Sequence, residues 1–166
     1  MNVYHVANPD STGSILANGL ERTSRGDKGD DKKIIKTDMF LDAKCPSELK
    51  NKGLSRDDNI YAYVVTDGMV MDITDGTPVP SDKFIEKNNR TLELEVDEKR
   101  CFVSDLDTYD SLMSAFASDA NESTLNTLAK SYWDKVTPLE KYINGQFRRP
   151  EIMITYDLAP NAIRLL

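Results

Sequence analysis

The chain has 166 residues, of which 39% are hydrophobic and 30% are charged, and its 28 acidic against 21 basic side chains give a net charge of −7. This length fits one domain, and the apolar residues suffice for a hydrophobic core. The single histidine and two distant cysteines are too few for a zinc site of thiolates and imidazoles, so we expect no metal. The acidic balance argues against binding to duplex DNA, which requires many lysines and arginines on one face.

Neither a secretory signal nor a membrane helix is indicated. The first residues lack a basic segment followed by an apolar one, and the longest apolar run, residues 60–65, is far shorter than the ~20 residues of a membrane helix. We therefore expect a cytoplasmic protein without a membrane partner, in which Cys45 and Cys101 are reduced thiols.

The amino-terminal part of the chain predicts a strand, a helix and a loop. Residues 3–6 form the strand, and the helix begins at Asp10 or Ser11 and ends at Gly19, because these residue types favour helix starts and ends. Residues 21–36 contain six basic and four acidic side chains with two glycines. This composition predicts a mobile surface loop that helps to close a site or contacts an anionic target.

The middle of the chain predicts short elements. Residues 39–41 indicate a strand, and Pro46 and Gly53 bracket a short helix. Residues 60–65 have the β-branched and aromatic content of a buried strand. The turn residues that follow it predict a hairpin, with residues 68–72 as the second strand.

The remaining strands are predicted by alternation and by apolar runs. Residues 91–96 alternate between apolar and polar side chains, as in a half-exposed strand, and residues 101–103 continue that strand or pair with it. Residues 152–154 and 162–165 indicate closing strands.

A helical region separates these strands. One helix begins at Asp105 and a second ends near Val136, because apolar side chains recur with helical spacing. Thr137 begins a capping-box pattern that predicts a third helix, ending at Gly145. The order of strands and helices is typical of an α+β fold rather than of a doubly wound parallel sheet.

Two amino-terminal segments, residues 4–8 and 14–20, resemble the opening of ADP-ribosyltransferase-like domains. In that family a strand with a Tyr/His pair leads into a small helix that ends in Ile-Leu-x-x-Gly-Leu. The resemblance implies a single domain over residues 1–166, with a split mixed or antiparallel sheet and flanking helices. It also implies that His5 binds a ribose hydroxyl in the adenosine half of NAD. A buried histidine on an edge strand is the structural alternative.

A tyrosine of this family stacks on the nicotinamide of NAD, and Tyr61 and Tyr63 are the matching candidates by resemblance. Strand alternation places both tyrosines on one face of the sheet, so the pattern does not choose between them. Core packing is the alternative for either ring.

Residues 146–154 resemble the segment in which these domains place a glutamate at the start of an apolar strand, and Glu151 matches that glutamate. A carboxylate beside the nicotinamide ribose accepts a hydrogen bond from the 2′-hydroxyl and stabilises the positive charge that develops at C1′. Nicotinamide leaves as a neutral molecule, so this chemistry requires no metal, cysteine or second histidine.

The sequence differs from several known branches of ADP-ribosyltransferase-like domains, and these differences argue against some classes of acceptor molecule. Arginine-specific transferases carry Gln or Glu two residues before the catalytic glutamate, where this chain has Arg149. The branch that modifies single-stranded DNA matches only the first 20 residues, and the related RNA 2′-phosphotransferases need several histidines and arginines. Arg56, Arg148 and Arg149 are candidates for the pyrophosphate of NAD, since guanidinium binds phosphate oxygens in pairs. Solvated surface arginines are the alternative.

The sequence thus predicts a toxin-like, NAD-dependent mono-ADP-ribosyltransferase that modifies a macromolecular acceptor, either a protein or a nucleic acid. Glu151 would be catalytic, and His5, Tyr61, Tyr63 and Arg56 would bind NAD. An antitoxin-like protein is an expected partner. The alternative is a non-catalytic binding or interaction module on an α+β fold, in which His5 and Glu151 are structural.

Overall fold

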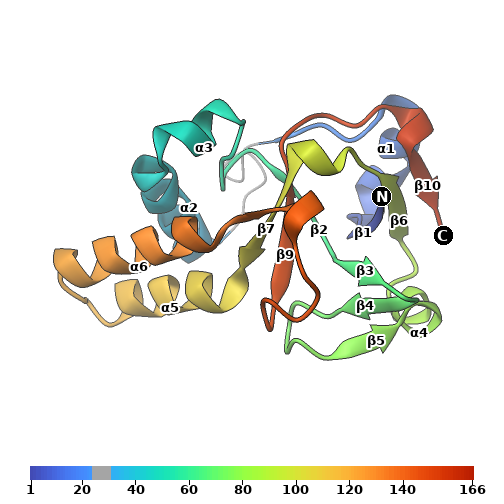
Figure 1. The fold of residues 1–166 in the computed structure, drawn as a ribbon. Helices are drawn as coiled ribbons and strands as arrows, with labels where there is room; N and C mark the ends of the chain where they lie inside the picture. Colours follow the sequence, from blue (N-terminus) through green and yellow to red (C-terminus); the bar gives the residue numbers. More distant parts are fainter. Residues whose placement is uncertain (24–30) are drawn as a thin grey trace.

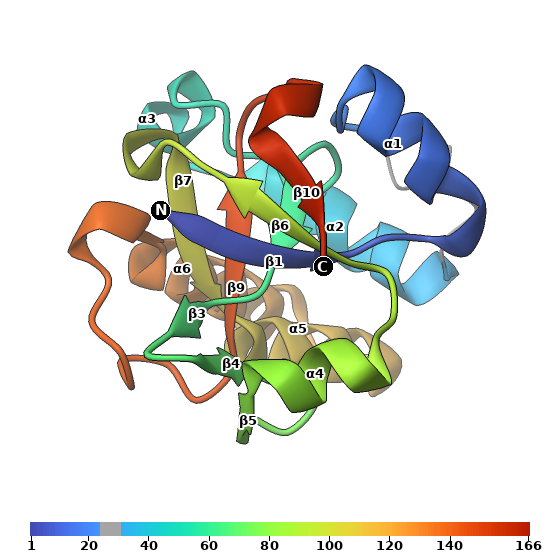
Figure 2. The same ribbon diagram turned by 90° about the vertical axis from the view of Figure 1, so that its right-hand side faces the viewer.

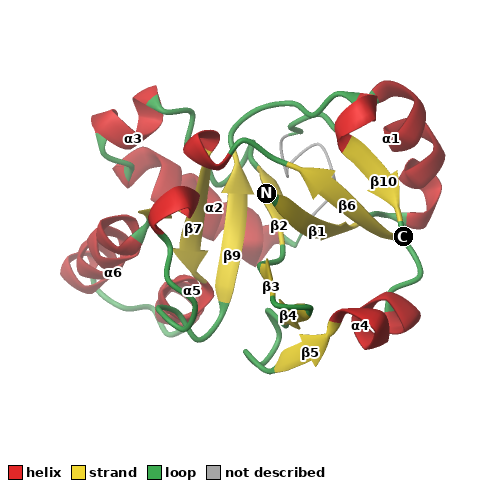
Figure 3. Cartoon of the chain, turned by 45° about the vertical axis from the view of Figure 1, so that its right-hand side comes forward, coloured by secondary structure: helices red, strands yellow, loops and turns green. Residues whose placement is uncertain are grey.

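A computed structural model describes residues 1–23 and 31–166 (Figure 1). Within these ranges the strands form three antiparallel sheets (Figure 3). The first sheet has the order β1 (Asn2–Val6), β6 (Thr91–Glu95), β10 (Ile163–Leu165). The second has the order β2 (Ile60–Ala62), β9 (Pro150–Ile154), β7 (Cys101–Asp105), β8 (Thr137–Pro138). The third has the order β3 (Val65–Thr66), β4 (Met69–Met71), β5 (Pro78–Pro80).

The helices segregate on either side of the second sheet. Figure 1 shows α2, α3, α5 and α6 on one side, and α1 with the first sheet on the other. Figure 2 shows α4 beside the third sheet at one end of the molecule. Their bounds are α1 Thr12–Asn18, α2 Lys32–Lys44, α3 Ser47–Asn51, α4 Ser81–Lys87, α5 Leu106–Ala117 and α6 Glu122–Lys135. The α+β class expected from the sequence is confirmed.

The second sheet separates two hydrophobic clusters. Because side chains alternate along β9, Ile152 and Ile154 point toward the first sheet, whereas Met153 points toward the helices. On the helical side the indole nitrogen of Trp133 donates to the carbonyl of Leu41 at 2.8 Å, which joins α6 to α2. A third, smaller cluster around Val70 and Phe84 lies under the third sheet.

The predicted amino-terminal strand and helix are confirmed. Gly19 ends α1 with a φ of +95°, and its amide donates to the carbonyl of Ile15 at 2.8 Å. The next residue, Leu20, exchanges backbone hydrogen bonds of 2.9 Å with Leu158. The end of α1 is therefore tied to the segment that precedes β10.

The strand predicted at residues 39–41 is wrong, because these residues lie inside helix α2. The side chain of Asp31 caps this helix by accepting from the amide of Lys33 at 2.7 Å. Thr37, Asp38 and Leu41 then face the protein interior with helical spacing. The loop expected over residues 21–36 is thus helical from Lys32 onward, and its residues 24–30 lie outside the described part of the chain.

The strand predicted at residues 60–65 divides into β2 and β3, which belong to different sheets. The hairpin after it is confirmed: β3 pairs with β4 across Asp67 and Gly68, whose φ angles of 50° and 74° suit a two-residue turn. Between the two strands Tyr63 pairs with Tyr4 of β1 in an isolated bridge. The chain therefore leaves the second sheet at Tyr63.

Two predictions in the second half of the chain are wrong. Strand β7 pairs with β9 and β8 rather than with β6, because a 3-10 turn at Glu98–Arg100 redirects the chain into the second sheet. The helix predicted from Thr137 to Gly145 is only a 3-10 turn at Leu139–Lys141. Thr137 does not cap it, since its hydroxyl donates to the carbonyl of Lys135 and accepts from the Gln146 amide.

The helices predicted from Asp105 and up to Val136 are confirmed as α5 and α6. Asp105 and Asn121 cap them through side chains that accept from backbone amides. The closing strands are confirmed as β9 and β10. None of the helices in residues 1–23 and 31–166 is both long enough and apolar enough to cross a bilayer.

Candidate active site

Arg56 occupies the centre of a polar cluster beneath α2. It lies in the loop between α3 and β2, and its side chain is only 2% exposed. The carboxylate of Asp42 shapes this loop, because it accepts from the amides of Arg56 at 2.6 Å and Asp57 at 3.1 Å and from the hydroxyl of Ser55 at 2.8 Å. The hydrogen bonds of Asp42 thus hold the backbone at Arg56 without involving the Arg56 side chain.

The guanidinium of Arg56 pairs with two buried carboxylates. Its Nη1 donates to Glu151 Oε1 at 2.7 Å and to the phenol oxygen of Tyr132 at 3.1 Å, and its Nε donates to Asp38 Oδ1 at 3.3 Å. Aromatic rings enclose it, with centroids 4.5 Å away in Tyr61 and 4.4 Å away in Tyr109. We refer to Arg56, Asp38, Tyr61, Tyr109, Tyr132 and Glu151 as the arginine cluster.

The cluster sets the protonation of its members. Burial acts to lower the pKa of Arg56, but Tyr132, Tyr61, Glu151 and Asp38 outweigh it and raise that pKa well above its usual value. Burial raises the pKa of Tyr132 to about 12, so this phenol is neutral at physiological pH. Arg56 is therefore a permanent cation in a part of the protein without bulk water.

Glu151 stands at the wall of a cavity. It lies on β9, the strand between β2 and β7, and is paired in register with Ser104. Its side chain is nearly buried, yet it borders a cavity of about 470 Å³ together with Arg56 and Arg149. The other lining residues come from α2, α5 and the segment after β4: Ile34, Ile73, Thr74, Leu106, Tyr109, Asp110 and Met113.

Arg148 and Arg149 anchor the segment that leads into β9. Arg149 pairs with Asp110 and donates to the carbonyl of Ile73 at 2.7 Å. Arg148 donates to Asp107 at 2.8 Å and to the carbonyl of Asp75 at 2.9 Å. Among these candidates for the pyrophosphate, Arg56 and Arg149 line the cavity, whereas Arg148 faces solvent.

His5 is connected to Glu151 through intermediate residues. Its Nδ1 lies 2.7 Å from the carbonyl oxygen of Tyr61, and because a carbonyl only accepts, Nδ1 carries the proton. The ring of Tyr61 contacts Arg56, which contacts Glu151. This chain of contacts joins three strands, because His5 lies on β1, Tyr61 on β2 and Glu151 on β9.

Tyr61 and Tyr63 do not share a face, contrary to the expectation from alternation. The ring of Tyr61 packs with the arginine cluster, and its hydroxyl donates to the carbonyl of Arg56. The ring of Tyr63 packs against Phe84 with centroids 4.9 Å apart. The expectation is wrong because the strand ends at Ala62, so the two-residue period does not extend to Tyr63.

Sequence reasoning missed Asp38, Tyr109 and Tyr132. Tyr109 and Tyr132 lie at positions of α5 and α6 where the helical spacing of apolar residues predicts burial. That spacing does not predict which polar group the phenol hydroxyl contacts. Asp38 lay between the predicted loop, residues 21–36, and the strand predicted at residues 39–41, so no predicted element included it. An acidic residue inside an apolar helical face was the one signal that pointed to a buried ionic partner.

Other reactive groups do not assemble in the described residues. No three His, Cys, Asp or Glu side chains gather there in the manner of metal ligands. Burial raises the pKa of Cys45 to about 11 and that of Cys101 to about 12, so neither thiol is ionised at physiological pH.

Comparison with models of known protein families, with curated proteins and with solved structures gave no match. The functional argument therefore rests on the chain's own residues.

Proposed function

We propose that this chain is an NAD-dependent mono-ADP-ribosyltransferase with the ADP-ribosyltransferase-like fold, and that Glu151 is its catalytic residue. The observation that carries the proposal is the position of Glu151, which borders a cavity while one of its oxygens is held by Arg56. The cavity of about 470 Å³ falls within the usual range for small-molecule sites, about 300–1,000 Å³. We assign it to the nicotinamide ribose.

The chemistry follows from a carboxylate that is nearly buried and held in place at the wall of a cavity. Arg56 holds Glu151 Oε1, and Tyr132 and Asp38 hold Arg56, so the carboxylate does not reorganise when charge develops on the substrate. The carboxylate accepts from the ribose 2′-hydroxyl as the bond between C1′ and nicotinamide breaks. Nicotinamide leaves with the bonding electron pair, and the acceptor nucleophile then attacks C1′ and releases its proton to solvent.

The other NAD-binding residues take roles that fit their positions. His5 lies two strands away from Glu151 and is assigned to the adenosine ribose. Tyr61 contacts Arg56, whereas Tyr63 packs on Phe84, which favours Tyr61 as the ring at the nicotinamide end. Arg149 lines the cavity and is assigned to the pyrophosphate, which would compete with Asp110 for its guanidinium, while Arg56 positions Glu151.

The decisive experiment replaces Glu151 with Gln, which keeps the shape of the side chain and removes its charge. We expect nicotinamide release from NAD to fall by at least about a hundredfold, the usual loss when one electrostatic stabiliser is removed. Glu95→Gln, on an exposed position of β6, is the matched control and retains activity. Circular dichroism confirms that both variants fold, and NAD labelled in the adenosine half shows whether protein, DNA or RNA in a lysate is the acceptor.

Full activity of Glu151→Gln would contradict the assignment of this residue. The absence of turnover by the unmodified protein with every acceptor would instead favour a non-catalytic interaction module. That alternative is supported by one observation: Glu151 is only 6% exposed and pairs with Arg56, as a structural carboxylate does.

A further inference from the structure

Helix α2 has two chemically different sides. Its inner side carries Asp38 and Leu41, which are buried against the arginine cluster and the helical core. Its outer side carries Ile35 and Met39 one helical turn apart, and the side chain of Met39 is 64% exposed. Packing among residues 1–23 and 31–166 does not account for an exposed methionine beside an isoleucine.

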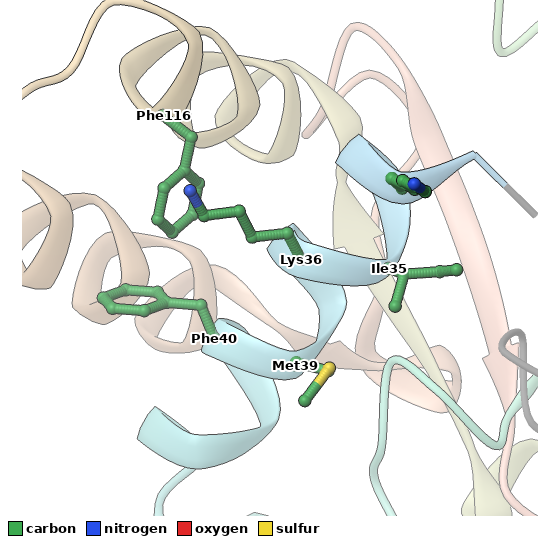
Figure 4. Close-up of a pocket in the computed structure, with 6 residues that line it drawn as sticks. Ile35, Lys36, Met39, Phe40 and Phe116 are labelled. Atoms are coloured by element: carbon green, nitrogen blue, oxygen red, sulfur yellow. The ribbon is translucent and has the colours of Figure 1, made fainter.

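The outer side of α2 forms a groove with α5. Figure 4 shows the side chains of Lys36 and Phe40 extending from α2 toward Phe116 of α5. Phe40 and Phe116 meet edge to face with centroids 5.1 Å apart, and Lys36 Nζ lies 4.9 Å from the Phe116 ring centroid. The groove has a volume of about 420 Å³, and the atoms that line it are mostly apolar. They belong to four apolar residues, Ile35, Met39, Phe40 and Phe116, and to Lys32 and Lys36.

Two lysines, Lys32 and Lys36, line this groove, and Lys44 Nζ lies 5.7 Å from the ring centroid of Phe40, although the chain as a whole is acidic. Lys32, Lys33, Lys36 and Lys44 are all exposed on α2. The helix's acidic residues are turned away from them, because Asp38 pairs with Arg56 and Asp42 caps the loop before β2. Within residues 1–23 and 31–166, the ion pairs of the protein involve none of these four lysines. As far as the described residues show, the groove thus has an apolar floor, and its two lysines form no ion pair.

We propose that this groove, defined by Lys32, Ile35, Lys36, Met39, Phe40 and Phe116, binds an acidic amphipathic helix of a partner protein. Apolar side chains one turn apart on such a helix would enter between Met39 and Phe116, and carboxylates beside them would meet Lys32 and Lys36. Charge complementarity favours an acidic helix over a basic one, because like charges that face each other across an interface repel. The inference is independent of the activity proposed for Glu151.

The groove also lies close to the candidate active site. Asp38 contacts Arg56 from the inner side of α2, and Met39, the next residue, faces the groove. Ile34 lines the cavity at Glu151, and Ile35, the residue after it, lines the groove. A helix docked on α2 would therefore rest on the element that supports the arginine cluster, while leaving the cavity on the other side of α2.

The test uses a designed peptide rather than an unidentified partner. A fluorescent peptide of about 18 residues, long enough to form a helix, has leucine at helical spacing on one face and glutamate elsewhere. A second peptide has the same leucines and lysine in place of glutamate. By fluorescence anisotropy with the full chain, we expect saturable binding of the acidic peptide that weakens as salt is raised, and at least about tenfold weaker binding of the basic one.

Substitutions locate the binding to the groove. Met39→Glu places a charge on the apolar floor and is expected to weaken acidic-peptide binding by at least about tenfold. The double variant Lys32→Glu/Lys36→Glu is expected to exchange the preference, so that the basic peptide binds more tightly. Lys83→Glu, at an exposed position of α4, is the matched control and leaves both affinities unchanged. Thermal unfolding confirms that each variant is folded.

Three results would overturn the inference: no saturable binding of the acidic peptide, equal affinity for both peptides, or an unchanged affinity in Met39→Glu. Binding to anionic phospholipid vesicles that is lost in Met39→Glu, without peptide binding, would assign the groove to a membrane surface and overturn it as well. Nicotinamide release is measured in the same variants. Since none of them changes a residue at the cavity, failure of peptide binding with intact turnover would leave the proposed function standing.

Discussion

Arg56 brings a full positive charge to a position where bulk water does not reach. Removing such an ion from water costs several kcal/mol, and this cost is offset only when partners with good geometry surround it. Here two carboxylates, a phenol oxygen and two aromatic rings do so. The arrangement makes Glu151 depend on Arg56, its ion-pair partner, whereas Arg56 without Glu151 would still be paired with Asp38.

Replacing Arg56 with Met tests this dependence. We expect the free energy of unfolding to fall by about 3–5 kcal/mol, since Glu151 and Asp38 lose their shared partner. Arg164→Met is the matched control: Arg164 pairs with Glu93 at 2.8 Å but is 69% exposed, so its loss should cost at most about 1 kcal/mol. Urea unfolding measures both, and equal losses would contradict a special role for Arg56.

Sequence reasoning singled out Arg56 and Glu151 separately but did not pair them. Glu151 precedes an apolar strand, a pattern visible in the sequence, and its placement on β9 follows. Arg56 has no periodicity around it, so its burial depends on Asp42 and on residues 76 and 95 positions away, namely Tyr132 and Glu151. Hydrophobic periodicity carries no information about contacts across such distances in the chain.

At the scale of elements, the positive φ angle at the end of α1 allows the backbone there to lie directly against the backbone at Leu158. Gly19 has a φ of +95°, and a Cβ atom added there would lie 2.3 Å from the carbonyl oxygen of Leu158. The same carbonyl accepts from Leu20. The turn after the helix therefore approaches the chain before β10 more closely than any residue with a side chain permits.

Two glycines of α1 and its cap give a matched comparison. We expect Gly19→Ala to lower the free energy of unfolding by at least about 2 kcal/mol, because the methyl group clashes and the φ angle is strained. Gly13→Ala, inside α1 with nothing within 4 Å of the added Cβ, should raise it by about 0.4–1 kcal/mol through lower entropy of the unfolded chain. Thermal or urea unfolding distinguishes the opposite signs, and a shared sign would refute the explanation.

Elements with a strong local signal were predictable and those defined by tertiary contacts were not. Helices α5 and α6 have both caps and apolar spacing, and the hairpin after Thr66 has turn residues that permit positive φ. Residues 39–41 have apolar side chains that suit a strand or a helix equally, and only the Asp31 cap and the interior contacts of Leu41 select the helix. The break at Tyr63 arises from its pairing with Tyr4, a contact with the first strand of the chain.

At the scale of the whole molecule, β9 belongs to both large hydrophobic clusters. Ile152 and Ile154 pack between the sheets, and Met153 packs under the helices. If β9 leaves one hydrophobic cluster, it also leaves the other, and the apolar side chains of both become exposed to water. The two halves should therefore unfold together, as the sequence-based expectation of one domain implies.

Two probes test this cooperativity in the Cys45→Ser background, where Cys101 is the remaining thiol. Fluorescence of Trp133 reports on the hydrophobic cluster beneath the helices, to which this residue belongs. Chemical labelling of Cys101 reports on the cluster between the first and second sheets. In the folded protein this thiol is buried and its pKa is raised to about 12, so it reacts only after that cluster opens. We expect the two signals to change at the same urea concentration. Exposure of Cys101 at clearly lower urea than the change in Trp133 would mean that the halves unfold separately.

The position of β9 in the chain also bears on how the protein is made. Strands β2 and β7 are synthesised long before β9, which lies between them, so both present unpaired edges while the ribosome is still adding residues. Unpaired edges are sites of association between chains, and a nascent molecule at this stage needs protection from its neighbours. Arg56 likewise cannot pair with Glu151, which follows it by 95 positions, before that residue has been synthesised. Until residues 150–154 have left the ribosome, Arg56 lacks one of the two carboxylates that surround it in the folded protein.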